Sequence, residues 1–438
     1  MAEVIKKKVG NLRWWVIGLI ALAAVINYID RQALSVLWPD IAAELYPNED
    51  NDGRKAIYGW ISASFVFFYA MGQALFGKIF DWIGTRLGFA ISIGVWSIAT
   101  ALHAFASGAW TFTIFRSILG VAEAGNWPGA AKGNAEWFPT HERAFAQGLF
   151  NSGAAVGGLV ALPTIALLTV WFSWQMIFIL VGVIGLLWLI PWFLIVKAPP
   201  QYHPNISEEE RQYILTGQKV GVSEETDGEE YNPTTAQLVK HKESWGVILA
   251  SAAIDPIWWL FIVWIPIYLN GVYGMDVKEI GLYGWVPYAG AMLGAWFGGL
   301  LAQNRIKAGW DVNKTRKWVI TLGCLIMFPS FFLLMNPGSP TIAVIIMAFI
   351  LFGFQTAIGN VQTLPSDLFS KNTVGTLSGI AGMAAKLGAF ALTILVPILT
   401  AGENYTPAFF VGAALTIIAL LAVWVLIPKV EKIQPLHN

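Results

Sequence analysis

Long apolar stretches follow one another along most of this 438-residue chain. A helix needs roughly 20 apolar residues to cross the hydrocarbon core of a bilayer, and an isolated strand would leave its backbone unpaired there. The pattern therefore predicts an all-α membrane protein with twelve transmembrane helices. The apolar stretches lie at residues 14–37, 57–80, 88–107, 110–135, 144–170, 174–196, 245–272, 280–303, 317–336, 341–364, 373–400 and 406–428.

A polar stretch at residues 197–244 divides these spans into six and six. It is rich in Glu, Lys, Gln and Pro, with acidic runs at residues 207–211, 224–225 and 229–230. Such composition is typical of a mostly flexible linker that contains one short amphipathic helix. We therefore expect three parts along the chain, namely an N-terminal six-helix bundle, a linker and a C-terminal six-helix bundle at residues 1–196, 197–244 and 245–438.

Composition narrows the possible function. Only 12% of the residues are charged, against about 25% in soluble domains, which favours a polytopic membrane protein. The formal net charge of zero argues against a nucleic-acid partner. The chain has one cysteine, Cys324, and neither a His-Glu-x-x-His helix nor a Gly-rich phosphate loop. We therefore expect no metal, no cofactor and no enzyme activity.

The distribution of lysine and arginine predicts the orientation. If the N-terminus is cytoplasmic, three basic residues lie outside and three lie within spans, which leaves 21 of the 27 on the cytoplasmic side. Basic residues concentrate on the cytoplasmic side of membrane proteins. Both termini and the linker are therefore expected in the cytoplasm. The six exceptions are Arg54, Lys55 and Lys278 outside, and Arg31, Arg116 and Lys386 within spans.

A short motif between the second and third spans suggests an internal repeat. It runs from Gly77 to Arg86 and contains Asp81 and Gly84, so a small turn is flanked by an acid and a base. A degenerate counterpart follows the eighth span, from Gly299 through Arg305 and Arg316. Matching devices in two halves are typical of transporters built from repeats. We assign structural or gating roles to Asp81 and Arg86.

The sequence resembles the major facilitator superfamily, and within it the anion:cation symporter family and its bacterial sugar-acid, or hexuronate, branch. The resemblance covers essentially the whole chain. It implies two six-helix bundles that move organic anions, generally with protons, by alternating access. It rests on residues 27–31, Tyr69, residues 115–116 and 123–128, residues 135–139 and 142–144, residues 150–153, residues 255–259 and residues 364–369.

Six charged residues lie within the expected spans, three of each sign. A charge at the bilayer centre costs about 2.5–3.5 kcal/mol even on insertion scales, so an uncompensated set is disfavoured. A balanced set indicates mutual neutralisation in or near a central cavity. The six are Asp30, Arg31, Arg116, Glu123, Asp255 and Lys386.

Three of these charges are candidates for the chemistry of transport. Arg31 offers a planar fork for a substrate carboxylate; the alternative is a permanent salt bridge to Asp30 or another acid. Asp30 and Glu123 are candidate proton carriers, because burial favours the protonated carboxyl. Arg116 lies two turns from Glu123 on the same helix face, so we place it with the proton-coupling residues. The alternative is a fixed ion pair between Glu123 and Arg116. The resemblance implies the same roles for these matching positions.

Other residues suit a polyhydroxylated substrate. Tyr28 and Tyr69 combine a stacking face with a hydroxyl, although simple packing is the alternative. Asn151, Asn360 and Gln362 are candidates for hydrogen bonds to sugar hydroxyls, with interhelical hydrogen bonds as the competing interpretation.

Lys386 is unusual for the sugar-acid branch. It either supplies a second cation to the substrate or neutralises Asp255. Contact with the substrate would favour a dicarboxylate such as an aldarate over a monocarboxylate.

Together these observations predict a proton-coupled symporter of the bacterial inner membrane that imports a sugar acid, a hexuronate first. Its partners would be the organic anion, protons and the lipid bilayer, and it would work as a monomer. The substrate would lie near the midplane between the bundles. A uniporter or exchanger of another organic anion, such as an aldonate or aldarate, is an alternative, and so is a membrane sensor that binds the anion without moving it.

Overall fold

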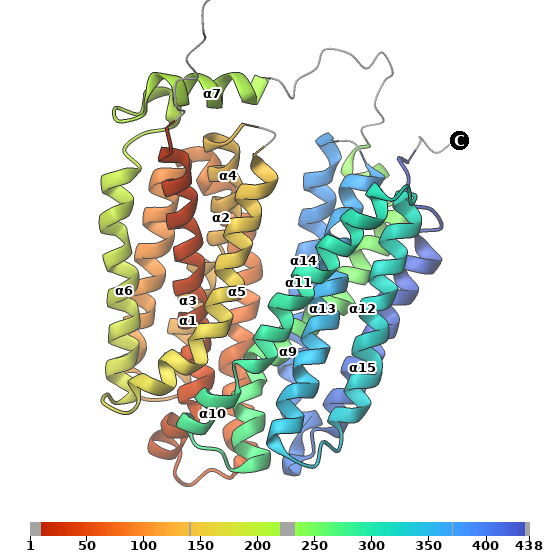
Figure 1. Ribbon diagram of the computed structural model, residues 1–438. Coiled ribbons are helices and arrows are strands. Elements are labelled where there is room, and N and C mark those ends of the chain that lie inside the picture. Colours follow the sequence, from red (N-terminus) through yellow and green to blue (C-terminus); the bar gives the residue numbers. More distant parts are fainter. Residues whose placement is uncertain (1–9, 140–141, 220–232, 370, 434–438) are drawn as a thin grey trace, which may run out of the picture. The chain divides into compact units, whose positions relative to one another are not determined.

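The computed structural model describes residues 10–139, 142–219, 233–369 and 371–433. Over these residues the chain forms helices joined by short connections (Figure 1). The helices are α1 Leu12–Leu45, α2 Asn51–Leu102, η1 His103–Phe105, α3 Ala109–Glu123, α4 Asn126–Trp137, α5 Arg143–Leu168, α6 Trp174–Ile195, η2 Pro200–Tyr202, α7 Glu208–Lys219, α8 Thr235–Leu238, α9 Lys242–Tyr273, α10 Val277–Tyr283, α11 Val286–Lys307, α12 Val312–Leu334, α13 Pro340–Leu368, α14 Lys371–Leu399, η3 Ala401–Glu403 and α15 Thr406–Leu426.

Ten helical segments within the described residues are long and apolar enough to cross a membrane. One of them, Asn51–Phe80, lies in α2, and the next, Trp82–Phe105, runs from α2 into η1. Near the start of the second segment α2 is kinked at Gly84, whose φ of 76° lies in the left-handed region that favours glycine. The turn expected between the second and third spans is therefore present.

The two remaining expected spans are helical but carry more polar residues. The span expected at residues 110–135 is broken into α3 and α4, and it contains Arg116 and Glu123. The span expected at residues 280–303 lies largely in α11, which continues to Lys307 and contains Gln303, Asn304 and Arg305 near its end. With these two, the described helices account for all twelve expected spans, and the predicted fold class is confirmed.

Internal contacts divide the chain into two compact units, which are described separately. Unit 1 comprises residues 1–31, 68–158 and 172–227, and unit 2 comprises residues 32–67, 159–171 and 228–438. The domain limits expected from the sequence, at residues 196 and 244, stay a prediction.

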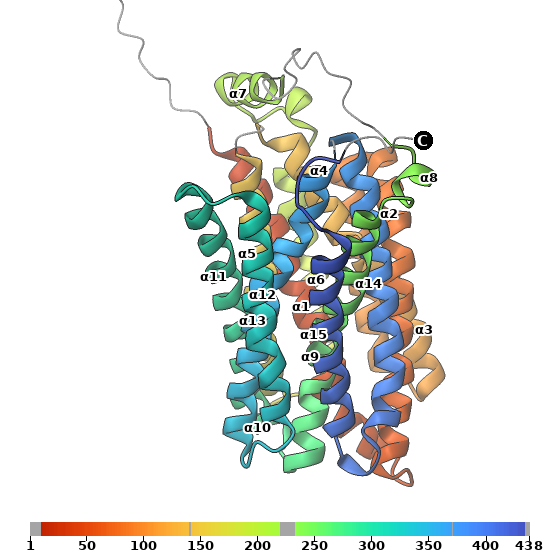
Figure 2. The same ribbon diagram turned by 90° about the vertical axis from the view of Figure 1, so that its right-hand side faces the viewer.

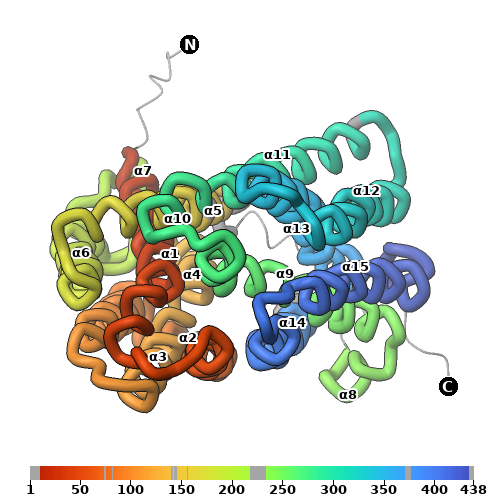
Figure 3. The backbone as a smooth tube through the Cα atoms, turned by 90° about the horizontal axis from the view of Figure 1, so that it is seen from below, coloured from red at the N-terminus to blue at the C-terminus, as the bar shows by residue number. Residues whose placement is uncertain are grey.

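In unit 2, α13 packs against both α11 and α12, while α9 packs against α14 and α15 (Figures 2 and 3). The α11–α13 contact depends on glycines spaced four residues apart. A Cβ at Gly290 would lie 2.3 Å from the carbonyl oxygen of Ala348, and one at Gly294 would lie 2.2 Å from that of Phe352. Any larger residue would push the two helix backbones apart.

In unit 1, the linker helix α7 lies across the end of α1 (Figure 1). The Glu210 carboxylate accepts hydrogen bonds from the backbone N–H groups of Leu12 and Arg13, each at 3.1 Å, and so caps α1. The Arg13 guanidinium pairs with Glu210 at 3.0 Å and with Glu142 at 2.8 Å. The helix expected within the linker is therefore present, whereas the acidic runs at residues 224–225 and 229–230 lie outside the described residues.

The connection from α6 to α7 is organised by His203. Its Nε2 lies 2.8 Å from the carbonyl oxygen of Ile195, and its Nδ1 accepts from the backbone N–H of Asn205 at 3.2 Å. Nε2 also lies 3.3 Å from the backbone nitrogen of Lys197. Burial lowers the pKa of His203, which favours the neutral ring.

Candidate functional site

The centre of the charge cluster in unit 1 is an ion pair between α1 and α3. Arg31 Nη2 lies 3.1 Å from Glu123 Oε2, and Arg31 Nε donates to the same oxygen at 3.3 Å. Arg31 Nη2 also donates to Asn27 Oδ1, one turn earlier on α1, at 3.1 Å. The Arg31 and Glu123 side chains are 4% and 0% exposed. This pair is sealed from solvent, and Glu123 occupies the Nε–Nη2 edge of the guanidinium.

Two tyrosine rings orient the same guanidinium. Arg31 Cζ lies 5.1 Å from the centre of the Tyr28 ring and 5.0 Å from that of Tyr69. Both rings are buried, and cation–π contacts of this length are attractive. The tyrosines predicted to lie at the site therefore contact its cation.

Asp30 has different partners from its neighbour Arg31, because adjacent helical residues point about 100° apart. Its Oδ2 is hydrogen-bonded to Thr100 of α2, and the side chain is 1% exposed. Glu123, Arg116 and Arg31 are its charged neighbours. Asp30 therefore belongs to the same cluster without being the acid that pairs with Arg31.

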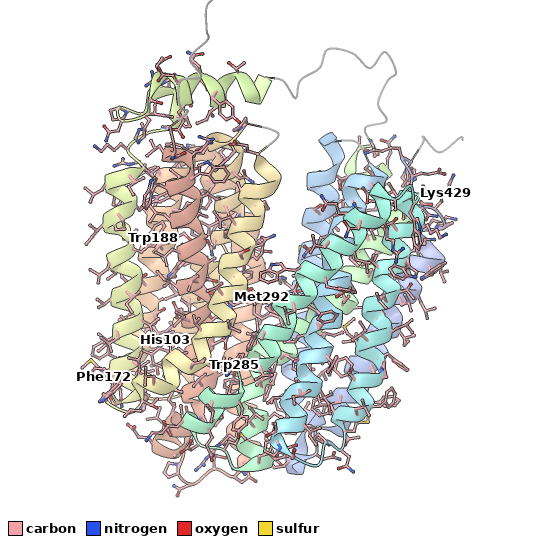
Figure 4. All side chains as sticks on the ribbon, viewed as in Figure 1. His103, Phe172, Trp188, Trp285, Met292 and Lys429 are labelled. Carbon is pink, nitrogen blue, oxygen red and sulfur yellow. The ribbon has the colours of Figure 1, made fainter. Side chains whose placement is uncertain are left out.

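Arg116 lies on the same buried side of α3 as Glu123, as the spacing predicts. Among the described residues, however, the ion pair of Glu123 is with Arg31, and Arg116 acts on Glu123 as a nearby charge. His103, labelled in Figure 4, is a neighbour of Arg116, and its Nδ1 lies 2.7 Å from the Ala99 carbonyl oxygen. The fixed Glu123–Arg116 pair considered from the sequence is not the one that forms.

Unit 2 contains a second ion pair within the expected spans. Lys386 Nζ of α14 lies 2.7 Å from Asp255 Oδ2 of α9, and Trp259 Nε1 donates to the same oxygen at 3.1 Å. The neutralising partnership considered for Lys386 is therefore present. The two side chains are 16% and 14% exposed, so this pair reaches solvent.

The close approach of α14 to α9 has a local cause. Pro256 has no N–H to donate to the Ala252 carbonyl one turn earlier in α9. A Cβ at Gly388 of α14 would lie 2.5 Å from that same carbonyl oxygen. A glycine in α14 therefore packs on the carbonyl that the proline leaves unpaired, which brings Lys386 next to Asp255.

The predicted polar contacts with sugar hydroxyls have different surroundings. Asn360 is buried between helices, where its Oδ1 accepts from Arg316 at 3.1 Å and its Nδ2 donates to the Thr356 carbonyl at 3.2 Å. Gln362 is exposed. Asn151, in unit 1, is also exposed and accepts from Gln147 at 3.2 Å. For Asn360, the hydrogen bond with Arg316 joins two helices, which agrees with the interhelical interpretation.

Asp81 and Arg86, on either side of Gly84, are the two residues expected to have structural or gating roles. Arg86 Nε donates to the Val196 carbonyl at 2.8 Å, and the Arg86 carbonyl accepts from Trp192 Nε1 at 3.0 Å. Arg86 therefore ties the start of the third span to the end of α6. The side chain of Asp81 lies outside the described residues.

Sequence reasoning missed several partners of these residues. Thr100, Trp259 and Arg316 contact Asp30, Asp255 and Asn360, but a threonine or tryptophan within an apolar span carries no distinguishing signal. The sequence places Lys55 on the outer side and does not predict its ion pair. Its ammonium is buried and lies 2.8 Å from Glu403 Oε2. Among the described residues, no group of three or more His, Cys, Asp or Glu side chains could hold a metal ion.

Comparisons with known proteins agree with this architecture. The family model of the Major Facilitator Superfamily matches residues 20–393. The hexuronate transporter of Escherichia coli (strain K12) is 31% identical over 442 residues, covering 99% of this chain and 98% of the relative. The galacturonate transporter of Dickeya chrysanthemi is 32% identical over 73% of this chain and 90% of the relative. The D-galactonate transporter of Escherichia coli O6:H1 is 30% identical over 97% and 98%.

Solved structures share the fold at lower sequence identity. A crystal structure of a D-xylose-proton symporter has a TM-score of 0.74 and 15% identity, covering 95% of this chain and 98% of the other. A bacterial homologue of the human lysosomal transporter Spinster has a TM-score of 0.71 and 18% identity, covering 96% and 98%. The protein is a multi-pass membrane protein, and the chain belongs to the major facilitator superfamily of transporters.

Proposed function

We propose that this protein is a proton-coupled symporter that imports a sugar acid, with hexuronates such as glucuronate and galacturonate as the first candidates. The observation that carries the proposal is the buried Arg31 fork, which is paired with Glu123 and flanked by Tyr28 and Tyr69. The relatives whose names include hexuronate, galacturonate and D-galactonate support the substrate class.

The proposed cycle follows from the competition for Arg31. A guanidinium binds a carboxylate in a bidentate manner, and Glu123 now occupies that position. A substrate carboxylate that displaces Glu123 would leave a buried, unpaired acid, which is costly unless the acid takes up a proton. Binding of the anion and uptake of a proton are thereby linked. Loss of that proton on the other side of the membrane lets Glu123 recover Arg31 and releases the substrate.

The remaining residues have supporting roles in the proposal. Tyr28 and Tyr69 would stack on the sugar chain or bond its hydroxyls once Arg31 has released Glu123. Asp30 would be a second proton carrier beside Glu123, and Arg116 would set the charge around both acids. Polar contacts from Asn151, Asn360 and Gln362 would read the hydroxyl pattern, which requires Asn360 to release Arg316. Lys386 would bind an additional anionic group of the substrate.

The proposal includes the setting of the protein. It would lie in the bacterial inner membrane with both termini cytoplasmic, as two six-helix bundles joined by the linker at residues 197–244, and would work as a monomer. Asp81, Arg86 and Asp255 would act in structure or gating rather than in substrate binding.

The test is uptake of radiolabelled glucuronate into proteoliposomes with an imposed pH gradient, acidic outside. The proposal predicts accumulation above the external concentration, and loss of that accumulation when a protonophore collapses the gradient. Equilibration without accumulation would instead support the uniporter or exchanger. Binding without any transport would support the sensor.

A further inference from the structure

The hydrogen bonds of Thr100 assign a protonation state to Asp30. Thr100 Oγ1 lies 3.0 Å from the carbonyl oxygen of Trp96, one turn earlier in α2, and it is also hydrogen-bonded to Asp30 Oδ2. A threonine hydroxyl has one proton, whereas a carbonyl oxygen and an ionised carboxylate are both acceptors only. One proton cannot satisfy both contacts. The conflict disappears if Asp30 carries a proton and donates it to Thr100, which then donates to Trp96.

Two further observations agree with a neutral Asp30. Its second oxygen, Oδ1, is buried and has no hydrogen-bond partner among the described residues. Glu123 Oε1 is likewise without one, but the other oxygen of Glu123 is paired with a guanidinium, whereas that of Asp30 is not. A bare carbonyl oxygen of a carboxylic acid costs less in such a place than a bare carboxylate oxygen. The guanidinium of the adjacent residue, Arg31, donates hydrogen bonds to Glu123 rather than to Asp30. In this structure the two acids therefore differ, with Glu123 ionised on Arg31 and Asp30 protonated on Thr100.

We propose that Thr100 is a positioning residue for proton coupling, because its hydroxyl can serve both protonation states of Asp30 by rotating. When Asp30 is protonated, Thr100 accepts from it and donates to the Trp96 carbonyl. When Asp30 loses its proton, the hydroxyl turns and donates to the carboxylate, while the backbone of α2 keeps the Trp96 carbonyl within the helix. The inference rests on the proposed function and names a further residue of the same site.

The groups that face Asp30 could also affect its titration and must be compared. The charged groups beside Asp30 are Arg31 on α1 and Arg116 and Glu123 on α3. Behind them, Tyr28 and Tyr69 contact the Arg31 guanidinium, and His103 on η1 is a neighbour of Arg116. None of their side chains changes in a Thr100 variant. A shift caused by Thr100→Val therefore reports on the hydroxyl itself.

The experiment measures the pH dependence of gradient-driven uptake in proteoliposomes for wild type, Thr100→Val and Thr100→Ser. Hydrogen bonds to an ionised group are stronger than those to a neutral one, so removing the hydroxyl penalises ionised Asp30 more. Thr100→Val should shift the midpoint of the pH profile upward by about one unit. Thr100→Ser keeps the hydroxyl and should restore the wild-type midpoint.

A matched control is Thr416→Val. Thr416 is also fully buried and donates to a carbonyl one turn earlier, that of Gly412 at 3.0 Å, but no carboxylate is among its hydrogen-bond partners. Its midpoint should match that of wild type. An unchanged midpoint in Thr100→Val, or an equal shift in Thr416→Val, overturns the inference.

Infrared spectroscopy separates this inference from the proposed function. A protonated carboxylic acid has a C=O stretch that ionised carboxylates lack, and Asp30→Asn identifies the band of Asp30. The inference predicts that this band is present in the substrate-free wild type and moves in Thr100→Val. Its absence overturns the inference even if uptake is proton-coupled. Its presence together with uncoupled uptake overturns the proposed function instead.

Discussion

Among the described residues, the two ion pairs that lie within the spans expected from the sequence differ in how far they reach solvent. Arg31 and Glu123 of unit 1 are 4% and 0% exposed, and two tyrosine rings cover the guanidinium. Lys386 and Asp255 of unit 2 are 16% and 14% exposed, and Trp259 contributes a hydrogen bond to the carboxylate. The two pairs have similar N–O distances, 3.1 and 2.7 Å, so distance alone does not separate them.

The difference indicates different functions for the pairs. A sealed ion pair cannot lose one member without leaving a buried charge, so exchange of that member for a ligand must be linked to protonation. A pair that reaches solvent can lose or share its partner at much smaller cost, because water screens the remaining charge. In the proposed transport cycle, the pair of unit 1 would serve coupling, and the pair of unit 2 would adjust which anion is accepted.

The largest expected effects are on stability and on substrate binding, and they distinguish the Arg31–Glu123 pair from the Lys386–Asp255 pair. Arg31→Gln leaves Glu123 without its cation, so the free energy of unfolding should fall by about 3 kcal/mol. Lys386→Gln should cost about 1 kcal/mol or less. Arg31→Gln should also weaken glucuronate binding about 100-fold or more, as measured by calorimetry on purified protein.

The double variant Arg31→Gln/Glu123→Gln provides the control, since it replaces the sealed pair by two neutral amides. It should recover stability without recovering binding. Wild-type affinity in Arg31→Gln would show that another cation binds the carboxylate.

The next prediction tests coupling at Glu123. Glu123→Gln keeps an oxygen for Arg31 but cannot carry a proton. Substrate counterflow should stay within about threefold of wild type, while accumulation driven by a pH gradient should disappear. Glu279→Gln, at an exposed helix N-terminus, is the control and should accumulate normally. Normal accumulation in Glu123→Gln would move the coupling role to another acid.

A smaller effect is expected at the pair that reaches solvent. Glucuronate and glucarate share a carbon chain but differ by one carboxylate, so they are a matched pair of ligands for Lys386. Lys386→Gln should weaken glucarate binding about tenfold, which corresponds to about 1.4 kcal/mol, and should leave glucuronate binding nearly unchanged. Lys386→Arg should retain the preference. Equal losses for both ligands would assign Lys386 to structure alone.

The smallest predicted effect concerns ion pairs of the linker helix α7. It tests whether burial also determines how much these pairs contribute to the free energy of unfolding. Glu210 is buried where it caps α1 and pairs with Arg13, whereas Glu208 of the same helix is 60% exposed in its pair with Arg211. Glu210→Gln should lower the free energy of unfolding by about 1 kcal/mol. Glu208→Gln should change the free energy of unfolding by less than about 0.5 kcal/mol. Thermal melts of both variants measure the two effects. Equal effects would mean that burial is not the deciding factor.

Particular elements show how far the sequence could predict the structure. The turn at Gly84 and the helix of the linker were predictable, because glycine and amphipathic patterns act locally. The break between α3 and α4 was not predicted, although Gly125 and Pro128 lie at it and both disfavour an unbroken helix. For Arg31, the alternative considered from the sequence was a salt bridge to Asp30 or another acid, and in the structure its partner is Glu123. Its predicted role in substrate binding stays a prediction.

What the sequence determined by itself was the set of spans, the balance of the charges within them and the residue types able to bind an anion. These follow from hydrophobic length and from the cost of a charge in lipid, which depend on composition along the chain. Only the tertiary structure decided the partners, pairing Arg31 with Glu123, Asp30 with Thr100 and Lys386 with Asp255. Partner choice depends on which helix faces meet and how closely, and that is set by packing between residues distant in the chain.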